Sequence, residues 1–217
     1  MNGPRLKVNA RPRAKAQQPN HFLSMRLKGE ELEKNFRAFY GQTAERYPKL
    51  RPFLIDPATM HLTMFVMHLP NDRVERAGEL LKSAKPLLDS HFQSRAPDIH
   101  LTGASTFGNR VVYATPSPLR DLEILNNLQK ELQIRFRDDG INLVGNRPQW
   151  TPHCTLMKIR PAPGNAGGSI PAKSWSGYKD FVWGSASIAG IDLCSMRDEK
   201  EADGYDRCVA HVPFVSD

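Results

Sequence analysis

The stretch Met60-His61-Leu62-Thr63-Met64-Phe65-Val66-Met67 is a short apolar run that carries one histidine and one threonine two residues apart. A second run of this kind, Pro152-His153-Cys154-Thr155-Leu156-Met157-Lys158-Ile159, follows 92 residues later. Side chains two residues apart on a β-strand point to the same face, so each run predicts an imidazole beside a hydroxyl. Leu62 and Cys154, which lie between them, are expected to point the other way.

The chemistry of these side chains indicates what a pair of such runs does. An imidazole takes up or releases a proton near neutral pH. A threonine hydroxyl donates a hydrogen bond to an anionic oxygen. Two histidine–threonine pairs that face one another would therefore hold a phosphate group between them.

A third pair of the same spacing, His100-Leu101-Thr102, competes with these two. Only 39 residues separate it from His61, which is too few for a second copy of a strand–helix unit. We therefore interpret this pair as a decoy. His68, His91 and His211 are likewise predicted to be ordinary strand or surface residues.

The composition predicts a soluble protein of the cytoplasm or the nucleus, and we expect a monomer. A chain of 217 residues with 40% hydrophobic content can bury a sizeable core, as one domain or as two joined lobes. No apolar run approaches the roughly 20 residues of a membrane helix, and the N-terminus lacks the apolar centre of a secretory signal. Its cysteines, Cys154, Cys194 and Cys208, are odd in number and not closely paired, which argues against a disulfide framework and a zinc site.

The net charge of +7 is concentrated at the N-terminus. Five basic residues precede position 20 with no acidic residue among them: Arg5, Lys7, Arg11, Arg13 and Lys15. Because the remainder is nearly balanced, phosphate binding is expected in a cleft and not on a broad basic face. We predict a disordered basic tail over residues 1–18, with a nuclear-import or RNA-tethering role left open, and a single two-lobed domain over residues 19–217.

The pattern of apolar residues predicts an α+β fold. Helices are expected over 30–47, over 74–91 with a kink or break at Pro86, and over 119–137 with a stop at Gly140. Strands are expected over 21–27, 61–69, 99–106, 111–115, 141–144, 153–159, 181–183, 187–196 and 205–212, with a hairpin turn at 108–110. The repeated order of strand, helix and motif-bearing strand predicts two related lobes, each supplying one motif.

Both motifs resemble the His-hydrophobic-Thr/Ser-hydrophobic signature of the 2H phosphoesterases, in which each of two lobes places one motif in a shared groove. Four stretches are similar to the central domain of the A-kinase anchoring proteins of this group: residues 19–24 (PNHFLS), 106–109 (TFGN), 152–158 (PHCTLMK) and 191–196 (IDLCSM). The similarity covers nearly all of residues 19–215. It implies a LigT-like 2H phosphoesterase fold, two-lobed and pseudo-duplicated, with antiparallel sheets lining a central groove and helices outside.

The same resemblance implies a function. This branch is associated with binding of adenosine monophosphate (AMP) and with metal-independent cleavage of 2′,5′-linked oligoadenylates, while other 2H members act on cyclic phosphates or RNA 3′ ends. The implied partners are thus an oligoadenylate, an RNA end or an AMP-like nucleotide, with no cofactor. Since the chain ends at Asp217 just beyond the last predicted strand, we do not expect the kinase-anchoring helix of those relatives. Cys154 stands where the anchoring proteins tend to have an aliphatic residue.

The resemblance assigns catalysis to His61, Thr63, His153 and Thr155. One histidine would remove a proton from a ribose hydroxyl, and the other would protonate the leaving 5′ oxygen. The threonines would donate hydrogen bonds to the nonbridging oxygens.

Six further residues are candidates for substrate binding. Base stacking is expected from Phe22, Phe107, Trp150 and Tyr205, and attraction of phosphate from Arg110 and Lys158. Core or rim packing is the alternative for each aromatic residue, and an exposed strand-end cation is the alternative for the last two. The competing function is a nonenzymatic AMP- or RNA-binding sensor or scaffold module that uses the same groove.

Overall fold

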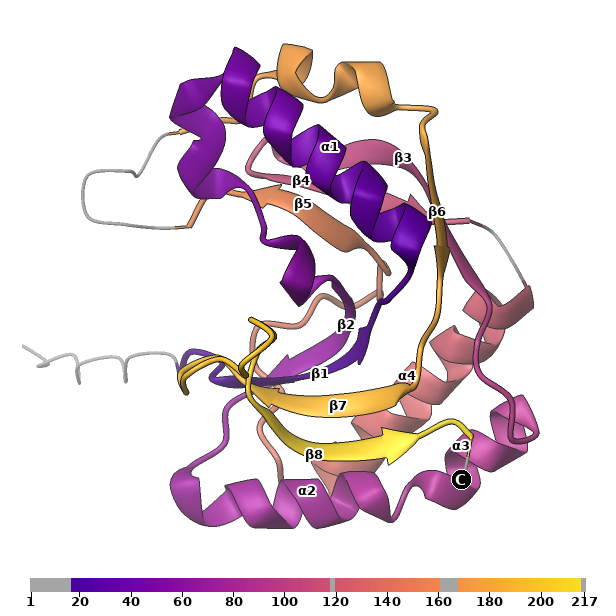
Figure 1. Ribbon diagram of the computed structural model, residues 1–217. Coiled ribbons are helices and arrows are strands. Elements are labelled where there is room, and N and C mark those ends of the chain that lie inside the picture. The colour runs from indigo at the N-terminus through magenta and orange to yellow at the C-terminus, as the bar shows by residue number, and fades with distance from the viewer. Residues whose placement is uncertain (1–16, 118–119, 161–167, 216–217) are drawn as a thin grey trace, which may run out of the picture.

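Two four-stranded antiparallel sheets form the centre of the molecule (Figure 1). The computed structural model describes residues 17–117, 120–160 and 168–215. The first sheet has the order β2 (His61–Met67), β1 (His21–Arg26), β7 (Gly190–Ser195) and β8 (Cys208–Pro213). The second sheet has the order β5 (Cys154–Lys158), β4 (Val111–Pro116), β3 (Ile99–Phe107) and β6 (Val182–Ala186). The predicted α+β class and the antiparallel pairing are confirmed.

The described residues form four α-helices that lie outside the sheets, and two of them cross from one half of the fold to the other (Figure 1). They are α1 (Glu30–Arg46), α2 (Val74–Lys82), α3 (Lys85–Phe92) and α4 (Arg120–Asp138). Helix α1 joins β1 to β2 of the first sheet but packs on β6 of the second. Conversely, α4 joins β4 to β5 of the second sheet but packs on β2 of the first. We call the first sheet with α2, α3 and α4 lobe 1, and the second sheet with α1 lobe 2.

Aromatic contacts anchor the two crossing helices to their sheets. Phe36 and Phe39 of α1 meet Trp183 of β6 edge-on, at ring-centroid distances of 5.0 and 5.6 Å. Phe136 of α4 meets Phe65 of β2 at 5.4 Å. All five side chains are buried, and burial of one large apolar side chain stabilises a fold by about 1.5–3 kcal/mol. Helix packing therefore fixes the sheets relative to one another.

Several predicted boundaries are confirmed by the structure. The expected break near Pro86 lies between α2 and α3, and Pro86 stands in the first turn of α3, where a missing N–H costs no helical bond. The turn at 108–110 joins β3 to β4, with Gly108 and Asn109 at φ values of 55° and 56°. Gly140, at φ 79°, follows the end of α4.

The predicted strand over residues 141–144 is wrong. Only Asn142 pairs, in an isolated bridge with His68 just beyond the end of β2. The chain then leaves the extended path, and side chains of the segment after it bond to β2 in place of its backbone. The apolar residues of 141–144 face lobe 1, although this segment does not pair with a neighbouring strand. Alternation of apolar and polar residues alone does not distinguish such a segment from a strand.

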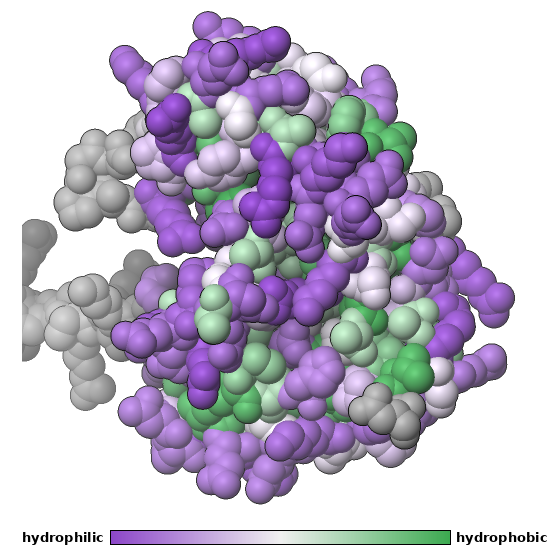
Figure 2. Space-filling model, viewed as in Figure 1, coloured by the Kyte–Doolittle hydropathy of each residue, from purple (hydrophilic) through white to green (hydrophobic). Residues whose placement is uncertain are grey.

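The predicted basic tail lies almost entirely outside the described residues. At its end, the Gln17 side chain accepts a hydrogen bond from Asn142 (2.7 Å), and the Gln18 carbonyl lies 2.8 Å from His68 Nδ1. No helix in the described ranges is long and apolar enough to cross a membrane. The face seen in Figure 2 is mainly hydrophilic, with apolar side chains confined to small patches.

Candidate active site

Each of the two motif histidines is held by the same local geometry. His61 opens β2, and its Nδ1 lies 2.7 Å from the carbonyl oxygen of Thr59. His153 immediately precedes β5, and its Nδ1 lies 2.7 Å from the carbonyl oxygen of Thr151. A carbonyl only accepts, so both imidazoles carry a proton on Nδ1. The Nε2 atoms are left as the reactive positions of the two rings.

The Thr63 hydroxyl lies beside His61, as predicted, and Thr155 lines the same cavity as both histidines. Thr63 Oγ1 lies 3.1 Å from His61 Nε2, and since that nitrogen is unprotonated in the neutral ring, the hydroxyl donates the hydrogen bond. Thr155 lines the same cavity, which has a volume of about 540 Å³ and also includes His61, Thr63 and His153. The structure thus brings all four predicted catalytic residues together.

Cys154 points away from this cavity, as the spacing predicts. The thiol is fully buried, and burial raises the pKa of Cys154 to about 12. Its sulfur accepts a hydrogen bond from the backbone of His61, so the opposite face of the second motif packs directly on the first. Cys154 therefore serves packing between the motifs and is not an available nucleophile.

Burial lowers the pKa of both motif histidines, His61 and His153. For His61 removal of water has the largest effect, partly offset by the bond to Thr59 and by the charge of Asp206, while His153 lowers the pKa further. For His153 removal of water again dominates, and Lys158 and Arg147 lower the pKa further. Both imidazoles are therefore mostly neutral at pH 7, and a bound phosphate would favour protonation of one of them.

Two aromatic rings contact each histidine. Phe22 lies 5.1 Å from His61 between ring centroids, and Tyr205 approaches the same ring edge-on at 6.4 Å. On the other side, Phe107 and Tyr113 meet His153 at 5.0 and 5.2 Å. These rings restrict the orientation of the imidazoles and exclude water from them.

A reciprocal exchange of hydrogen bonds places the two motifs relative to each other. Strands β2 and β5 are edge strands of their sheets, and they lie in contact. The segment that leads into β2 covers the free edge of β5, where Ile55 N donates to Leu156 O at 3.0 Å. The segment that leads into β5 in turn covers the free edge of β2. There the Asn146 amide bonds both Val66 N and Val66 O (2.9 and 2.7 Å), and Trp150 Nε1 donates to Thr63 O at 2.8 Å.

The predicted substrate-binding residues divide into those that line the groove and those that do not. Phe22 lines the 540 Å³ cavity together with His61. Phe107 and Trp150 line an adjoining cavity of about 300 Å³ that shares Thr63, His153, Thr155 and Lys158 with the first. The Phe107 ring is stacked on Tyr113 at 4.2 Å and covered by the guanidinium of Arg147 at 4.3 Å.

Lys158 belongs to both cavities, as its predicted role requires. The surrounding protein removes water from its ammonium and lowers the pKa of Lys158, and the charge of Arg160 adds to this. Arg110 lies in the β3–β4 turn and lines neither groove cavity, whereas Arg147 and Arg160 do. Lys158 therefore lines the groove as predicted, and Arg147 and Arg160 line it in place of Arg110.

The stacking role expected for Tyr205 does not fit its position. Its side chain is only 2% exposed, and its hydroxyl is hydrogen-bonded to Ser24 Oγ at 3.1 Å. Arg26 covers its ring, with the guanidinium carbon 4.2 Å from the centroid. Tyr205 supports His61 from outside the groove and offers no free face to a base.

The third pair lies elsewhere, as the interpretation of a decoy requires. His100 stands on β3 and lines neither of the two groove cavities. Its Nδ1 bonds Ser185 Oγ at 2.9 Å, and its Nε2 lies 3.3 Å from Asp98. Asp98 stands two positions before His100, where the catalytic motifs have threonine.

The sequence does contain a signal that separates the true motifs from the decoy. Thr59 and Thr151 each precede the catalytic histidine by two residues, so the shared pattern is Thr-x-His-x-Thr. We missed these threonines because they act through their backbone carbonyls, which any residue type could supply. Among the described residues no group of three or more His, Cys, Asp or Glu side chains is placed to hold a metal ion.

Comparisons with known proteins agree with this geometry. The family model of the AKAP7 2′5′ RNA ligase-like domain matches residues 19–214. Human A-kinase anchor protein 7 isoform gamma is 27% identical over 199 residues, which cover 90% of this chain but 57% of that protein. The chain therefore spans little more than half the length of this relative.

Solved structures share the fold. LigT of E. coli in complex with 3′-AMP superposes with a TM-score of 0.55 at 18% identity, covering 90% of this chain and 94% of that one. A phosphoesterase superposes with 0.54 at 20% identity, covering 90% and 96%. The PDE domain of MHV ns2 superposes with 0.52 at 16% identity, covering 82% and 99%.

The match of the family model extends over nearly the whole described chain and includes both Thr-x-His-x-Thr segments. Its two lobes, the paired motifs and the groove between them are the architecture that the sequence resemblance implied. The chain belongs to the family of AKAP7 2′5′ RNA ligase-like domains.

Proposed function

We propose that this chain is a phosphodiesterase that cleaves 2′,5′-linked oligoadenylates or related RNA phosphodiesters without a metal. The observation that carries the proposal is the duplicated site. Two histidines with Nδ1 fixed on a carbonyl line one cavity together with Thr63 and Thr155, and the Thr63 hydroxyl is bonded to His61. Binding alone would not require two titratable imidazoles, whereas in-line transfer of a phosphoryl group requires both a base and an acid.

The proposed reaction follows from these positions. The unprotonated Nε2 of one histidine removes the proton of a ribose hydroxyl, whose oxygen attacks the neighbouring phosphorus. The bond from phosphorus to the 5′ oxygen breaks, and the other histidine, protonated on Nε2, gives its proton to that oxygen. The products are a cyclic phosphate and a shortened chain with a free 5′ hydroxyl.

The threonines stabilise the charge that develops on the nonbridging oxygens. In the free protein the Thr63 hydroxyl is bonded to His61 Nε2. When that nitrogen binds a proton, the hydroxyl turns and donates to the phosphate instead. The ammonium of Lys158, which lines both cavities, adds a positive charge next to the phosphate.

The two adjoining cavities suit a substrate with a nucleoside on each side of the phosphate. The shared residues Thr63, His153, Thr155 and Lys158 hold the scissile phosphate. One nucleoside enters the larger cavity beside Phe22, and the other enters the smaller one, where the guanidinium of Arg147 offers a face for a base. LigT, which shares the fold, was solved with 3′-AMP bound, and this supports a nucleotide ligand here.

The experiment is cleavage of end-labelled 2′,5′-linked and 3′,5′-linked oligoadenylate in the presence of EDTA. We expect the wild type to cleave at least one of them, and His61→Ala and His153→Ala each to reduce the rate by about 10²-fold or more. His100→Ala, which removes the decoy histidine, is the matched control and should retain the wild-type rate. Tight AMP binding without turnover would favour the sensor function instead, and turnover that survives both substitutions would refute the proposal.

A further inference from the structure

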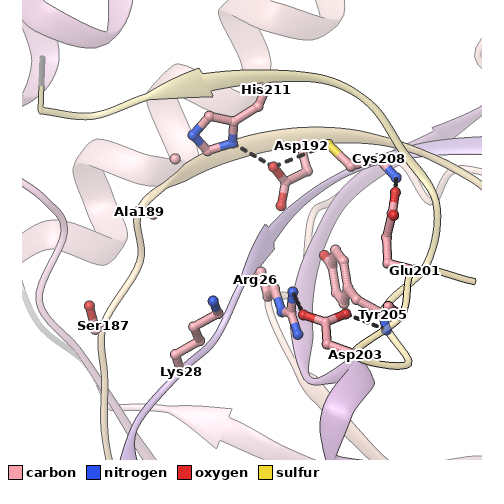
Figure 3. A pocket seen from close by; sticks show the side chains of 12 residues that line it. Arg26, Lys28, Ser187, Ala189, Asp192, Glu201, Asp203, Tyr205, Cys208 and His211 are labelled. Carbon is pink, nitrogen blue, oxygen red and sulfur yellow. Dashed lines mark hydrogen bonds and ion pairs between the residues drawn. The ribbon is translucent and has the colours of Figure 1, made fainter. Parts of the chain in front are cut away.

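A cavity of about 570 Å³ lies outside the catalytic groove, within the range of small-molecule sites (Figure 3). Its walls are the end of β1 with Arg26 and Lys28, the chain around Ser187 between β6 and β7, the strands β7 and β8, and the segment 201–205. Neither catalytic histidine lines it. The proposed phosphodiesterase reaction therefore leaves this cavity without a role.

One cation that lines the cavity makes no close ion pair in the described part of the chain. Each lining carboxylate has a partner: Asp192 bonds His211 (2.6 Å), Asp203 bonds Arg26 (2.8 Å) and Glu201 bonds Arg207 (3.3 Å). Lys28, in contrast, forms no ion pair within residues 17–117, 120–160 and 168–215; it lies near enough to Asp203 for its charge to help lower the pKa of that carboxyl, and its ammonium is directed into the cavity (Figure 3). This end of the cavity, with Arg26 and the Ser187 hydroxyl nearby, favours an anion.

The partner of Arg26 is one that a ligand could replace. The Asp203 side chain is 54% exposed, and an ion pair at such exposure contributes little to stability. A phosphate accepts two parallel hydrogen bonds from a guanidinium and carries more charge than one carboxylate. A phosphate group between Lys28 and Arg26 would therefore compete with Asp203.

Replacement of Asp203 would be felt in the catalytic groove. The segment 196–206 forms a wall between the two cavities: Asp198, Lys200 and Asp206 line the groove, while Glu201, Asp203 and Tyr205 line the second cavity. Arg26 is the cross-strand neighbour of His61, and Asp203 accepts a hydrogen bond from the Tyr205 backbone (3.1 Å). Tyr205 contacts the His61 ring, so loss of the Arg26–Asp203 pair frees the segment that supports this histidine.

We propose that this cavity is a second binding site for a phosphate monoester, held by Lys28, Arg26 and Ser187, whose occupation alters nucleotide affinity in the catalytic groove. Only the identity of the groove's own ligand rests on the function proposed above. Inorganic phosphate and the phosphate of a nucleoside monophosphate share the required chemistry. Both are therefore used as probes.

The test is a titration of the ¹⁵N-labelled full chain with inorganic phosphate and, separately, with 5′-AMP, followed by amide chemical shifts. Amides of Lys28, Ser187 and Ala189 report the second site, and those next to His61 and Thr155 report the groove. We expect Lys28→Gln to weaken binding at the second site about tenfold, which is about 1.4 kcal/mol. The control Lys82→Gln, an exposed lysine on α2, should leave it unchanged.

The coupling is tested without any second-site ligand. The groove ligand for this test is the deoxydinucleotide d(ApA), which carries no phosphate monoester for the second site and no ribose hydroxyl that could be cleaved. Asp203→Asn releases Arg26, so it should change the Kd of d(ApA) measured at the groove amides, while Lys28→Gln alone should not. Absence of shifts at Lys28, Ser187 and Ala189 with both probes would overturn the second site. An unchanged groove Kd in Asp203→Asn would overturn the coupling, and neither result depends on whether the protein cleaves RNA.

Discussion

Removal of the Asn146 amide tests whether the segment before β5 holds the first motif, on β2, in place. In Asn146→Ala, two hydrogen bonds to Val66, of 2.9 and 2.7 Å, are lost from the free edge of β2. At about 1 kcal/mol net for each bond, the loss is about 2 kcal/mol. For a chain of this size that lowers Tm by about 4–8 °C. Because Thr63 lies three residues away on the same strand, we also expect kcat to fall about tenfold to a hundredfold.

The assay combines thermal unfolding with turnover of the preferred oligonucleotide. Trp150→Phe is the companion variant, since it keeps the ring but removes the donor to Thr63 O, and it should lower Tm and kcat less than Asn146→Ala does. Asn127→Ala, at an exposed position of α4, is the control and should leave both unchanged or raise Tm slightly. If Asn146→Ala behaves like this control, the hydrogen bonds from the segment before β5 to the free edge of β2 do not position the first motif.

Three further predictions concern the groove. Thr63→Val and Thr155→Val should each lower kcat by about 10²-fold with little change in KM, which steady-state kinetics would show; a change in KM alone would assign them to ground-state binding. Activity should survive EDTA, and a loss that a divalent metal restores would contradict the acid–base mechanism. His61 and His153 have lower pKa values in the folded chain than the 6.5 of a free imidazole. Below pH 6.5 the unfolded chain therefore binds more protons than the folded chain, and the free energy of unfolding falls as the pH drops. The Tm of His153→Gln should fall less over this range than that of the wild type, and parallel curves would refute the burial effect.

The fold class and the meeting of the four motif residues in one cavity could be predicted from local sequence because they depend on periodicity. Side chains two apart share a face of a strand, so His61 with Thr63 and His153 with Thr155 were recognisable without knowledge of the fold. Helix α4 was equally clear, since its buried residues recur at helical spacing. Even the reversal at 108–110 follows from residues that tolerate a positive φ.

What could not be predicted depends on contacts between distant segments. The side chain of Asn146 replaces a neighbouring strand for β2, and no local pattern distinguishes an asparagine that does this from a loop asparagine. Tyr205 was a candidate for base stacking because it is aromatic, but Arg26 and Ser24 hold it on the other side of His61. The carbonyls of Thr59 and Thr151 orient the imidazoles through backbone atoms, so the sequence shows the repeated threonine but not the role of its carbonyl.

The pH dependence of kcat/KM tests most directly the claim that His61 and His153 act as an acid–base pair. The free protein must hold one imidazole neutral and the other protonated, and burial places the pKa of both below 6.5. Measured from about pH 5 to 9 with the preferred oligonucleotide, kcat/KM should follow a bell with its maximum on the acid side of pH 6.5. His61→Gln and His153→Gln should each remove one limb from the residual activity. A profile that stays flat over this range while chemistry limits the rate would contradict the acid–base pair.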